Sequence, residues 1–179
     1  EASTGQSSHT IVSGSPIDPS VIARNHNPGE TWDAMTDYAM MRRNVRVFMK
    51  LFECDKPVVA AVHGACIGGG LEIAACCDIR IAGSAARFGV PIAKLGFPLA
   101  PAELEIVAAV DGPTLLRELL IEARVLDAQE ALARGLVTRV VADADVAAEA
   151  RDSAERIAEL SPQALRLNKR ALRQFTHAA

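Results

Sequence analysis

The sequence predicts an α/β fold, in which short strands alternate with helices. An apolar run at residues 57–62 leads directly into a glycine-rich turn, and a second short apolar segment at residues 79–82 follows the next helix. Hydrophobic residues make up 50% of the 179 residues, which is enough for a substantial core. The length is typical of a single domain.

Residues 1–30 are rich in Ser, Gly, Pro and Asn and have no sustained apolar period. We therefore expect a flexible or disordered segment there, with a mobile lid as the alternative. From residue 31 apolar side chains recur every three or four positions, which predicts an amphipathic helix packed on the core. This stripe either belongs to the core or lines a binding pocket. Its members are Trp32, Met35, Tyr38, Met41, Val45, Phe48 and Phe52.

Capping and helix-breaking residues indicate the later elements. The Gly-Pro pair at residues 112–113 predicts the start of a helix that runs to about residue 123. Asp127, with Glu130 three residues later, matches a capping box, so a helix is predicted over residues 127–135. The remaining predicted elements are a strand at residues 136–141 and helices at about residues 143–160 and 162–175.

Three successive glycines at the start of a predicted helix form the most informative feature of the chain. Gly68, Gly69 and Gly70 carry no side chains, so a ligand can approach their amides closely. The N–H groups of a first helical turn also attract an oxygen with negative charge. Glu72 lies nearby, where its carboxylate can act on the same ligand as acid or base. The pattern predicts an oxyanion hole, and the alternative is a tight turn followed by an acid that is favourable at a helix N-terminus.

Two phosphate-binding motifs are excluded by spacing. Gly64 and Gly69 are separated like the glycines of a P-loop, but Gly70 and Leu71 stand where that loop needs Lys and Ser or Thr. A dinucleotide-binding fingerprint fails as well, because Ile73 occupies the place of its third glycine.

Charge and composition limit the classes of partner. The net charge is −3 with acidic and basic residues interspersed, so neither nucleic acid nor an anionic membrane is expected as a partner. No apolar run approaches the roughly 20 residues that span a bilayer, and the polar start does not resemble a secretory leader. We therefore expect a cytoplasmic protein. The four cysteines form no C-x-x-C pair, so we predict reduced, mostly buried thiols and no metal site.

The segment KPVVAAVHGACIGGGLE at residues 56–72 resembles the central signature of the crotonase family, also called the enoyl-CoA hydratase/isomerase family. Further matches follow in the family's order: DIRIA at 78–82, ARFG at 86–89, LG at 95–96 and ALARGLVTRV at 131–140. The resemblance covers about residues 56–141. It implies a crotonase-like spiral of ββα units with C-terminal helices, and an acyl-CoA thioester as substrate.

By this resemblance, the Gly69 amide would hold the thioester carbonyl oxygen while the negative charge of an enolate develops on it. Glu72 would match one of the two catalytic carboxylates of a hydratase. The residues expected to contact substrate are Ala65, Ile67, Gly68, Gly69 and Ile92. Because CoA is part of the substrate, no separate cofactor is expected. Relatives assemble through C-terminal helices, which implies a homotrimer or hexamer.

The resemblance also divides the chain. We expect a crotonase-like acyl-CoA-binding core at residues 31–141 and a C-terminal helical segment at residues 142–179. Relatives have further strands, a helix and a loop with a second oxyanion amide before the matched part, and further helices after it. The chain therefore resembles a member of the family that is truncated at both ends, and its fold is expected to be incomplete at the N-terminus. We expect residues 1–179 alone to be an incomplete catalyst.

One position departs from a working hydratase. The family segment Phe-Gly-x-Pro-Glu reads FGVPI at residues 88–92, so Ile92 stands where relatives have a second catalytic glutamate. Hydration needs an activated water and a proton delivered to the neighbouring carbon, and paired carboxylates share that work. Glu103 or Glu105 would be the substitute for this missing second carboxylate, although two glutamates near a helix start more often form a solvated face.

Three functional hypotheses follow. The first is an enoyl-CoA hydratase/isomerase family enzyme, a lyase of fatty acid metabolism, with Glu72 as its main acid or base. The second is an isomerase, decarboxylase or thioester hydrolase that uses the same enolate-stabilising amides. The third is an acyl-CoA-binding protein without turnover. Lys169, Arg170 and Arg173 either approach a CoA phosphate or, as we expect, form a solvated helix face.

Overall fold

The computed structural model describes residues 34–95, 98–99 and 101–177. The predicted flexible segment at residues 1–30 and Trp32 of the apolar stripe lie outside the described residues.

The chain is built from repeated ββα units. The first unit comprises β1 (Val59–Val62), β2 (Ala65–Ile67) and α3 (Gly69–Ala75). The second unit comprises β3 (Ile79–Gly83), β4 (Arg87–Gly89), a 3-10 turn η1 (Pro91–Leu95) and α4 (Pro101–Leu120). The first strands of the two units pair in parallel in one sheet, and the second strands pair in parallel in another. The polypeptide therefore advances as a spiral between two small sheets.

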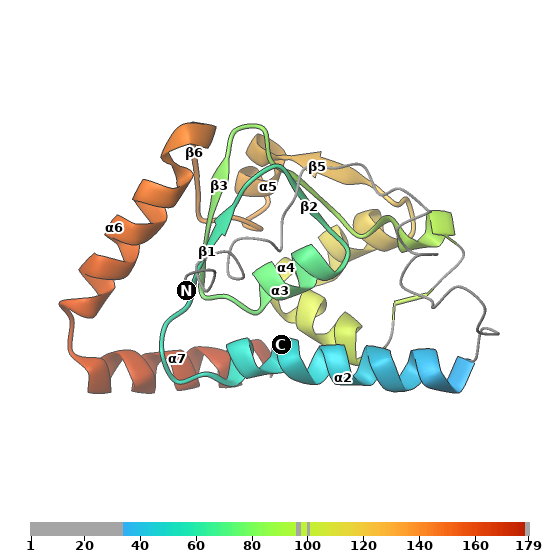
Figure 1. Cartoon of the computed structure of the whole chain (residues 1–179), viewed down its shortest axis with the longest axis horizontal. Coiled ribbons are helices and arrows are strands. Elements are labelled where there is room, and N and C mark those ends of the chain that lie inside the picture. Colours follow the sequence, from blue (N-terminus) through green and yellow to red (C-terminus); the bar gives the residue numbers. More distant parts are fainter. Residues whose placement is uncertain (1–33, 96–97, 100, 178–179) are drawn as a thin grey trace, which may run out of the picture.

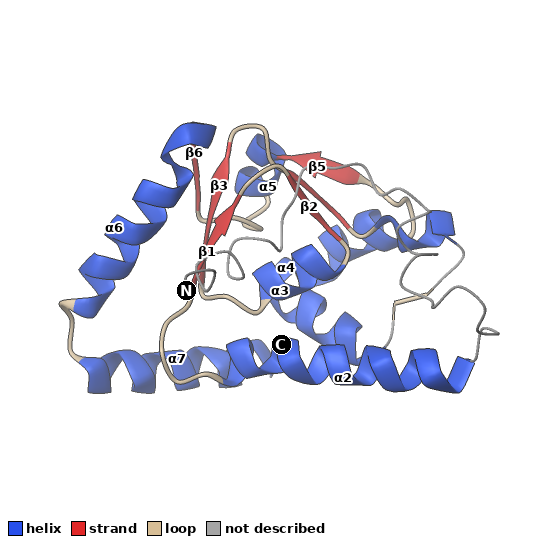
Figure 2. Ribbon diagram, in the orientation of Figure 1, coloured by secondary structure: helices blue, strands red, loops and turns tan. Residues whose placement is uncertain are grey.

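The following elements complete both sheets. They are β5 (Val125–Asp127), α5 (Ala128–Ala133) and β6 (Arg139–Val141). β5 pairs antiparallel with β4, and β6 pairs in parallel with β3. The strand orders are β1-β3-β6 and β2-β4-β5, and Figure 2 shows the two groups of strands with helices around them.

Three longer helices enclose this centre. They are α2 (Ala34–Glu53), α6 (Val146–Ala158), which follows the 3-10 turn η2 (Asp143–Asp145), and α7 (Pro162–His177). α6 packs against β1 and β3, whereas α2 contacts α3 (Figure 1). Arg173 of α7 donates a hydrogen bond to the carbonyl oxygen of Phe52 at 2.9 Å, which joins α7 to the end of α2.

The core joins side chains from both sheets and α4. Phe88 on β4, Leu119 on α4 and Leu126 on β5 are fully buried in one cluster. A second cluster joins Val45 of α2 to α3, with Phe48 packed against it. These stripe residues of α2 therefore belong to the core.

Several predicted elements are confirmed, and some boundaries are wrong. The capping box of α5 is present: the Glu130 N–H donates to Asp127 Oδ1 at 2.8 Å, and the Asp127 N–H donates to Glu130 Oε2 at 3.3 Å. A helical stretch begins at residues 112–113 as predicted, and Gly112, whose φ of 72° leaves the helical region, separates it by a kink from an earlier stretch of α4 that starts at Pro101 and was not predicted. The strands β2, β4 and β5 were not predicted, because three residues are too few to show a period.

The predicted solvated face of the last helix is wrong at Lys169. Its side chain is 5% exposed, and its ammonium donates to Asp78 Oδ2 at 2.7 Å and to the carbonyl oxygen of Lys56 at 2.8 Å. Arg170 pairs with Asp55 and helps to lower the pKa of that carboxyl to about 2, mainly by donating a hydrogen bond to it. Lys169 and Arg170 thus join α7 to residues 55, 56 and 78.

The cysteines have no disulfide partner: Cys66, Cys76 and Cys77 are buried, and Cys54 is half-buried. Within the described ranges, no group of three or more His, Cys, Asp or Glu side chains is arranged to hold a metal ion. The helices of the described part are all too short or too polar to cross a membrane.

Candidate functional site

The turn between β2 and α3 has a backbone that only glycine adopts easily. Gly68, the residue before the helix, has φ 57° and ψ −124°. Its N–H donates to the carbonyl oxygen of Gly89 at 2.8 Å, which joins the turn to the end of β4. Its own carbonyl accepts the N–H groups of Leu71 at 2.9 Å and Glu72 at 3.1 Å. The helix offers no acceptor to the N–H groups of Gly69 and Gly70, because they precede its hydrogen-bonded part.

Gly69 lies at the protein surface beside an aromatic ring. The residue is exposed, and a Cβ atom built on it would be 4.0 Å from Cζ of Phe48 on α2. This is an ordinary van der Waals distance, so the space would also admit alanine. The predicted oxyanion amide therefore has both a solvent-accessible backbone and an apolar neighbour.

Glu72 is buried although it carries a carboxyl group. It lies in the first turn of α3 and is 5% exposed. Burial raises its pKa from 4.5 to about 7, and the negative charge of Glu103 adds to the rise. A carboxyl with a pKa near neutrality is well suited to exchange protons at physiological pH.

Glu103 is the charged neighbour of this buried carboxyl. It lies in the first turn of α4, is 3% exposed, and belongs to a helix that packs against α3. The expected solvated face is therefore wrong for Glu103, while the side chain of Glu105 lies outside the described part of the chain. The sequence contained Glu103 as a candidate, but its burial depends on how α4 meets α3.

The nearby Cys76 is a poor nucleophile. Burial raises the pKa of its thiol to about 12, with further contributions from Cys77 and Glu72. The thiol is therefore protonated at neutral pH, and only the thiolate attacks efficiently.

The other predicted substrate contacts lie on the elements around the turn. Ala65 and Ile67 are half-buried on β2 and flank the fully buried Cys66, so they point away from the core side of that short strand. Ile92 lies in η1, is half-buried, and packs against the main core cluster. The structure thus gathers the predicted residues onto β2, α3 and η1, while their contact with substrate stays a prediction.

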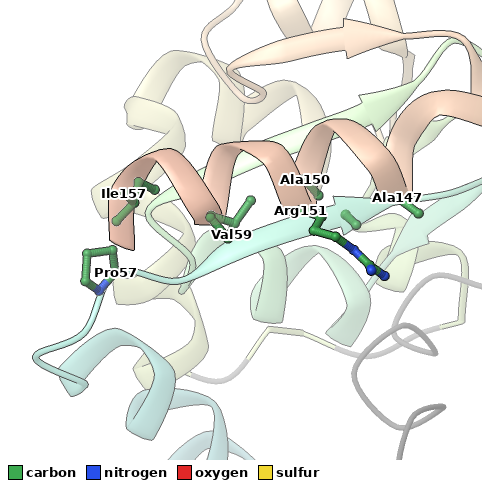
Figure 3. A pocket seen from close by; sticks show the side chains of 8 residues that line it. Pro57, Val59, Ala147, Ala150, Arg151 and Ile157 are labelled. Atoms are coloured by element: carbon green, nitrogen blue, oxygen red, sulfur yellow. The ribbon is translucent and has the colours of Figure 1, made fainter. Parts of the chain in front are cut away.

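One surface groove in the described part of the chain lies away from the turn between β2 and α3. This groove lies between β1 and α6 and has a volume of about 380 Å³. Figure 3 shows its lining side chains, and among these described residues only Arg151 is charged. Its lining residues are Pro57, Val59, Ala61, Ala147, Ala150, Arg151, Ala154 and Ile157. None of the predicted site residues is among them, so this groove is not the candidate site.

Known proteins resemble the chain in sequence. The family described as Enoyl-CoA hydratase/isomerase matches residues 29–179. The chain is 39% identical over 127 residues to the Short-chain-enoyl-CoA hydratase of Clostridium acetobutylicum, which covers 71% of this chain and 49% of that protein. It is 35% identical over 136 residues to the mitochondrial Delta(3,5)-Delta(2,4)-dienoyl-CoA isomerase of Dictyostelium discoideum, which covers 75% of this chain and 46% of that protein. The chain spans about half the length of the curated relatives it matches.

Solved structures resemble the chain in fold. An enoyl-CoA hydratase/carnithine racemase from Magnetospirillum magneticum superposes with a TM-score of 0.76 at 40% identity, over 80% of this chain and 54% of that one. An enoyl-CoA hydratase subunit from Geobacillus kaustophilus HTA426 superposes with a TM-score of 0.75 at 31% identity, over 89% of this chain and 59% of that one. These neighbours confirm the predicted crotonase-like α/β fold. From its sequence and its fold, the chain belongs to the enoyl-CoA hydratase/isomerase family.

Proposed function

We propose that the protein acts on an acyl-CoA thioester by stabilising an enolate at the turn between β2 and α3. The observation that carries this proposal is that α3 begins with the exposed Gly69 and holds the buried Glu72 in its first turn. The names of the relatives support the substrate class, since they are a hydratase and an isomerase of enoyl-CoA and dienoyl-CoA thioesters.

In the proposed reaction, the thioester carbonyl oxygen accepts a hydrogen bond from the N–H of Gly69. Negative charge grows on that oxygen as the enolate forms, so a donor fixed in advance lowers the barrier by about 3 kcal/mol. Glu72 then moves a proton at the carbon next to the carbonyl, for which its pKa of about 7 is suited. Ala65, Ile67 and Ile92 border the acyl chain in this proposal.

The reaction type follows from how many carboxylates take part. Hydration needs two proton-handling roles, and Ile92 supplies neither. Isomerisation moves one proton between two carbons of the same substrate, which a single carboxylate can do. The resemblance to a dienoyl-CoA isomerase favours isomerisation as the second candidate beside hydration.

Two substitutions at Gly69 test the proposed oxyanion amide. Proline is tolerated at the first position of a helix but has no N–H, so Gly69→Pro removes the donor while it also restricts the backbone of Gly68. Gly69→Ala keeps the N–H and meets only Phe48 at 4.0 Å. With 2-enoyl-CoA and 3-enoyl-CoA thioesters as substrates, we expect kcat to fall about 10²-fold or more in Gly69→Pro and to stay near the parent value in Gly69→Ala.

The products identify the reaction in the same assays. A 3-hydroxyacyl-CoA indicates hydration, and a shifted double bond indicates isomerisation. A folded Gly69→Pro protein that keeps the parent rate would contradict the assignment of this amide.

Assembly as a homotrimer or hexamer and a cytoplasmic location remain predictions. The exposed leucines of α7 support assembly, because Leu167 is 56% and Leu172 is 65% exposed.

A further inference from the structure

We infer that Gly89 is a positioning residue for the proposed oxyanion donor, the N–H of Gly69. Gly89 ends β4, the middle strand of the sheet β2-β4-β5, so its backbone has a neighbouring strand on each side. This inference rests on the proposed function, and it goes further by identifying what holds the donor in place.

The hydrogen bonds of Gly68 are the first argument. Its N–H donates to the carbonyl oxygen of Gly89 at 2.8 Å, and its own carbonyl accepts the N–H groups of Leu71 and Glu72. The N–H of Gly69 belongs to the same planar peptide group as that carbonyl and points the opposite way, out of the helix. The direction of the proposed donor is therefore set by α3 on one side of Gly68 and by Gly89 on the other.

The space around Gly89 is the second argument. A Cβ atom built on it would lie 2.9 Å from the carbonyl oxygen of Arg124 and 3.1 Å from Cγ2 of Val125, which is closer than packed atoms normally approach. The φ of Gly89 is not positive, so β4 needs a glycine here for the close approach of β5 and not for an unusual backbone angle. The absence of a side chain thus lets β5 set the position of β4.

The turn before β5 holds Arg124 in place. The Arg124 N–H donates to the carbonyl oxygen of Glu118 at 3.2 Å, and its guanidinium pairs with the carboxylates of Glu118 and Glu130. Ala123, directly before it, is buried and has a φ of 51°, a conformation that costs an alanine about 1 kcal/mol and persists only where its surroundings enforce it. The carbonyl that faces Gly89 therefore cannot move away without disturbing these contacts.

The core side of β4 cannot relieve a collision either. Phe88 and Val90, the residues on each side of Gly89, are fully buried. Close-packed interiors transmit a displacement, and β2 and β5 lie on opposite sides of β4, so a side chain at position 89 would push β4 toward the turn at Gly68. A displaced donor loses part of its effect on the developing enolate, because that effect depends on geometry.

The experiment compares the purified parent protein with Gly89→Ala, using acetoacetyl-CoA as the probe. This 3-oxo thioester ionises to an enolate that absorbs ultraviolet light, so a pH titration of the absorbance gives the pKa of the bound probe. We expect that pKa to be about one pH unit higher in Gly89→Ala than in the parent, and kcat with an enoyl-CoA to be about 10-fold lower. The Kd for butyryl-CoA, which stays un-ionised, should remain near the parent value.

The matched control is Gly83→Ala on β3, in the other sheet. Its new Cβ would also collide with a neighbour, at 2.1 Å from Asp143 Oδ1. This variant should lose stability but keep the probe pKa and the kcat of the parent. If its losses in probe pKa and kcat equal those of Gly89→Ala, the inference is overturned, because the effect is then a general one of destabilisation.

The outcomes separate this inference from the proposed function. If Gly89→Ala ionises the probe like the parent and keeps the parent kcat, the inference is overturned while the function stands. If the parent ionises the bound probe no more easily than the free probe and turns over neither 2-enoyl-CoA nor 3-enoyl-CoA, the proposed function fails and this inference fails with it. If Gly89→Ala does not fold, amide hydrogen exchange of the parent decides: the Gly68 N–H must exchange far more slowly than an exposed amide, and fast exchange overturns the inference.

Discussion

The buried carboxyl of Glu72 should make the stability of this protein depend on pH. Its pKa rises from 4.5 to about 7 in the folded protein. Since the folded state binds this proton more tightly than the unfolded chain, the contribution to stability is fully present below pH 4.5 and is lost as the pH rises through 7. Each tenfold change in proton affinity is worth about 1.4 kcal/mol, so between pH 5 and pH 8 the loss amounts to about 2 to 3 kcal/mol.

The substitution Glu72→Gln removes this titration and keeps the size of the side chain. Relative to the parent, its free energy of unfolding should therefore rise by about 2 to 3 kcal/mol between pH 5 and pH 8, whatever the cost of the new amide at either pH. Urea unfolding of both proteins at the two pH values measures the difference.

The exposed Glu155→Gln provides the control, because a solvated carboxyl should give the same difference from the parent at both pH values. The reasoning is refuted if the difference between Glu72→Gln and the parent is also the same at pH 5 and pH 8. That result would mean that Glu72 ionises in the folded protein as easily as in the unfolded chain.

Two further substitutions test the packing around the sheets by urea unfolding at pH 7. Gly83→Ala should lower the free energy of unfolding by about 1 to 3 kcal/mol, because the new Cβ would lie 2.1 Å from Asp143 Oδ1 and 3.3 Å from Asp143 Cα. An unchanged stability would show that Asp143 moves away at no cost. Asp78→Ala should cost about 3 to 5 kcal/mol because it leaves the buried ammonium of Lys169 without its carboxylate, whereas Lys169→Met should cost less. Equal losses in these two variants would argue against a buried charge as the cause.

Much of the local structure could be predicted from neighbouring residues. The capping box at Asp127 and Glu130 spans three positions, so the sequence alone specifies both partners. The helical period of α2 and the glycines before α3 are likewise local signals. The glycine turn with Glu72 close behind it was predicted for the same reason.

Other features depend on segments far apart in the chain. The three-residue strands β2, β4 and β5 have no period of their own and exist because each has a partner strand. The ion pair of Lys169 joins residues 91 positions apart, which no helical pattern on α7 reveals. The sequence near Lys169 predicts a solvated face because it does not reveal Asp78, the partner of the ion pair.

For the candidate site, the chemical groups can be read from the sequence: a backbone donor at Gly69, a carboxyl at Glu72, and a hydrocarbon at Ile92. The environment of those groups depends on how the helices and strands pack. The packing of α4 on α3 buries Glu103 beside Glu72 and raises the pKa of Glu72 toward neutrality. Burial and the distance between charges set a pKa, and both arise when the two helices meet, so neither can be read from the sequence.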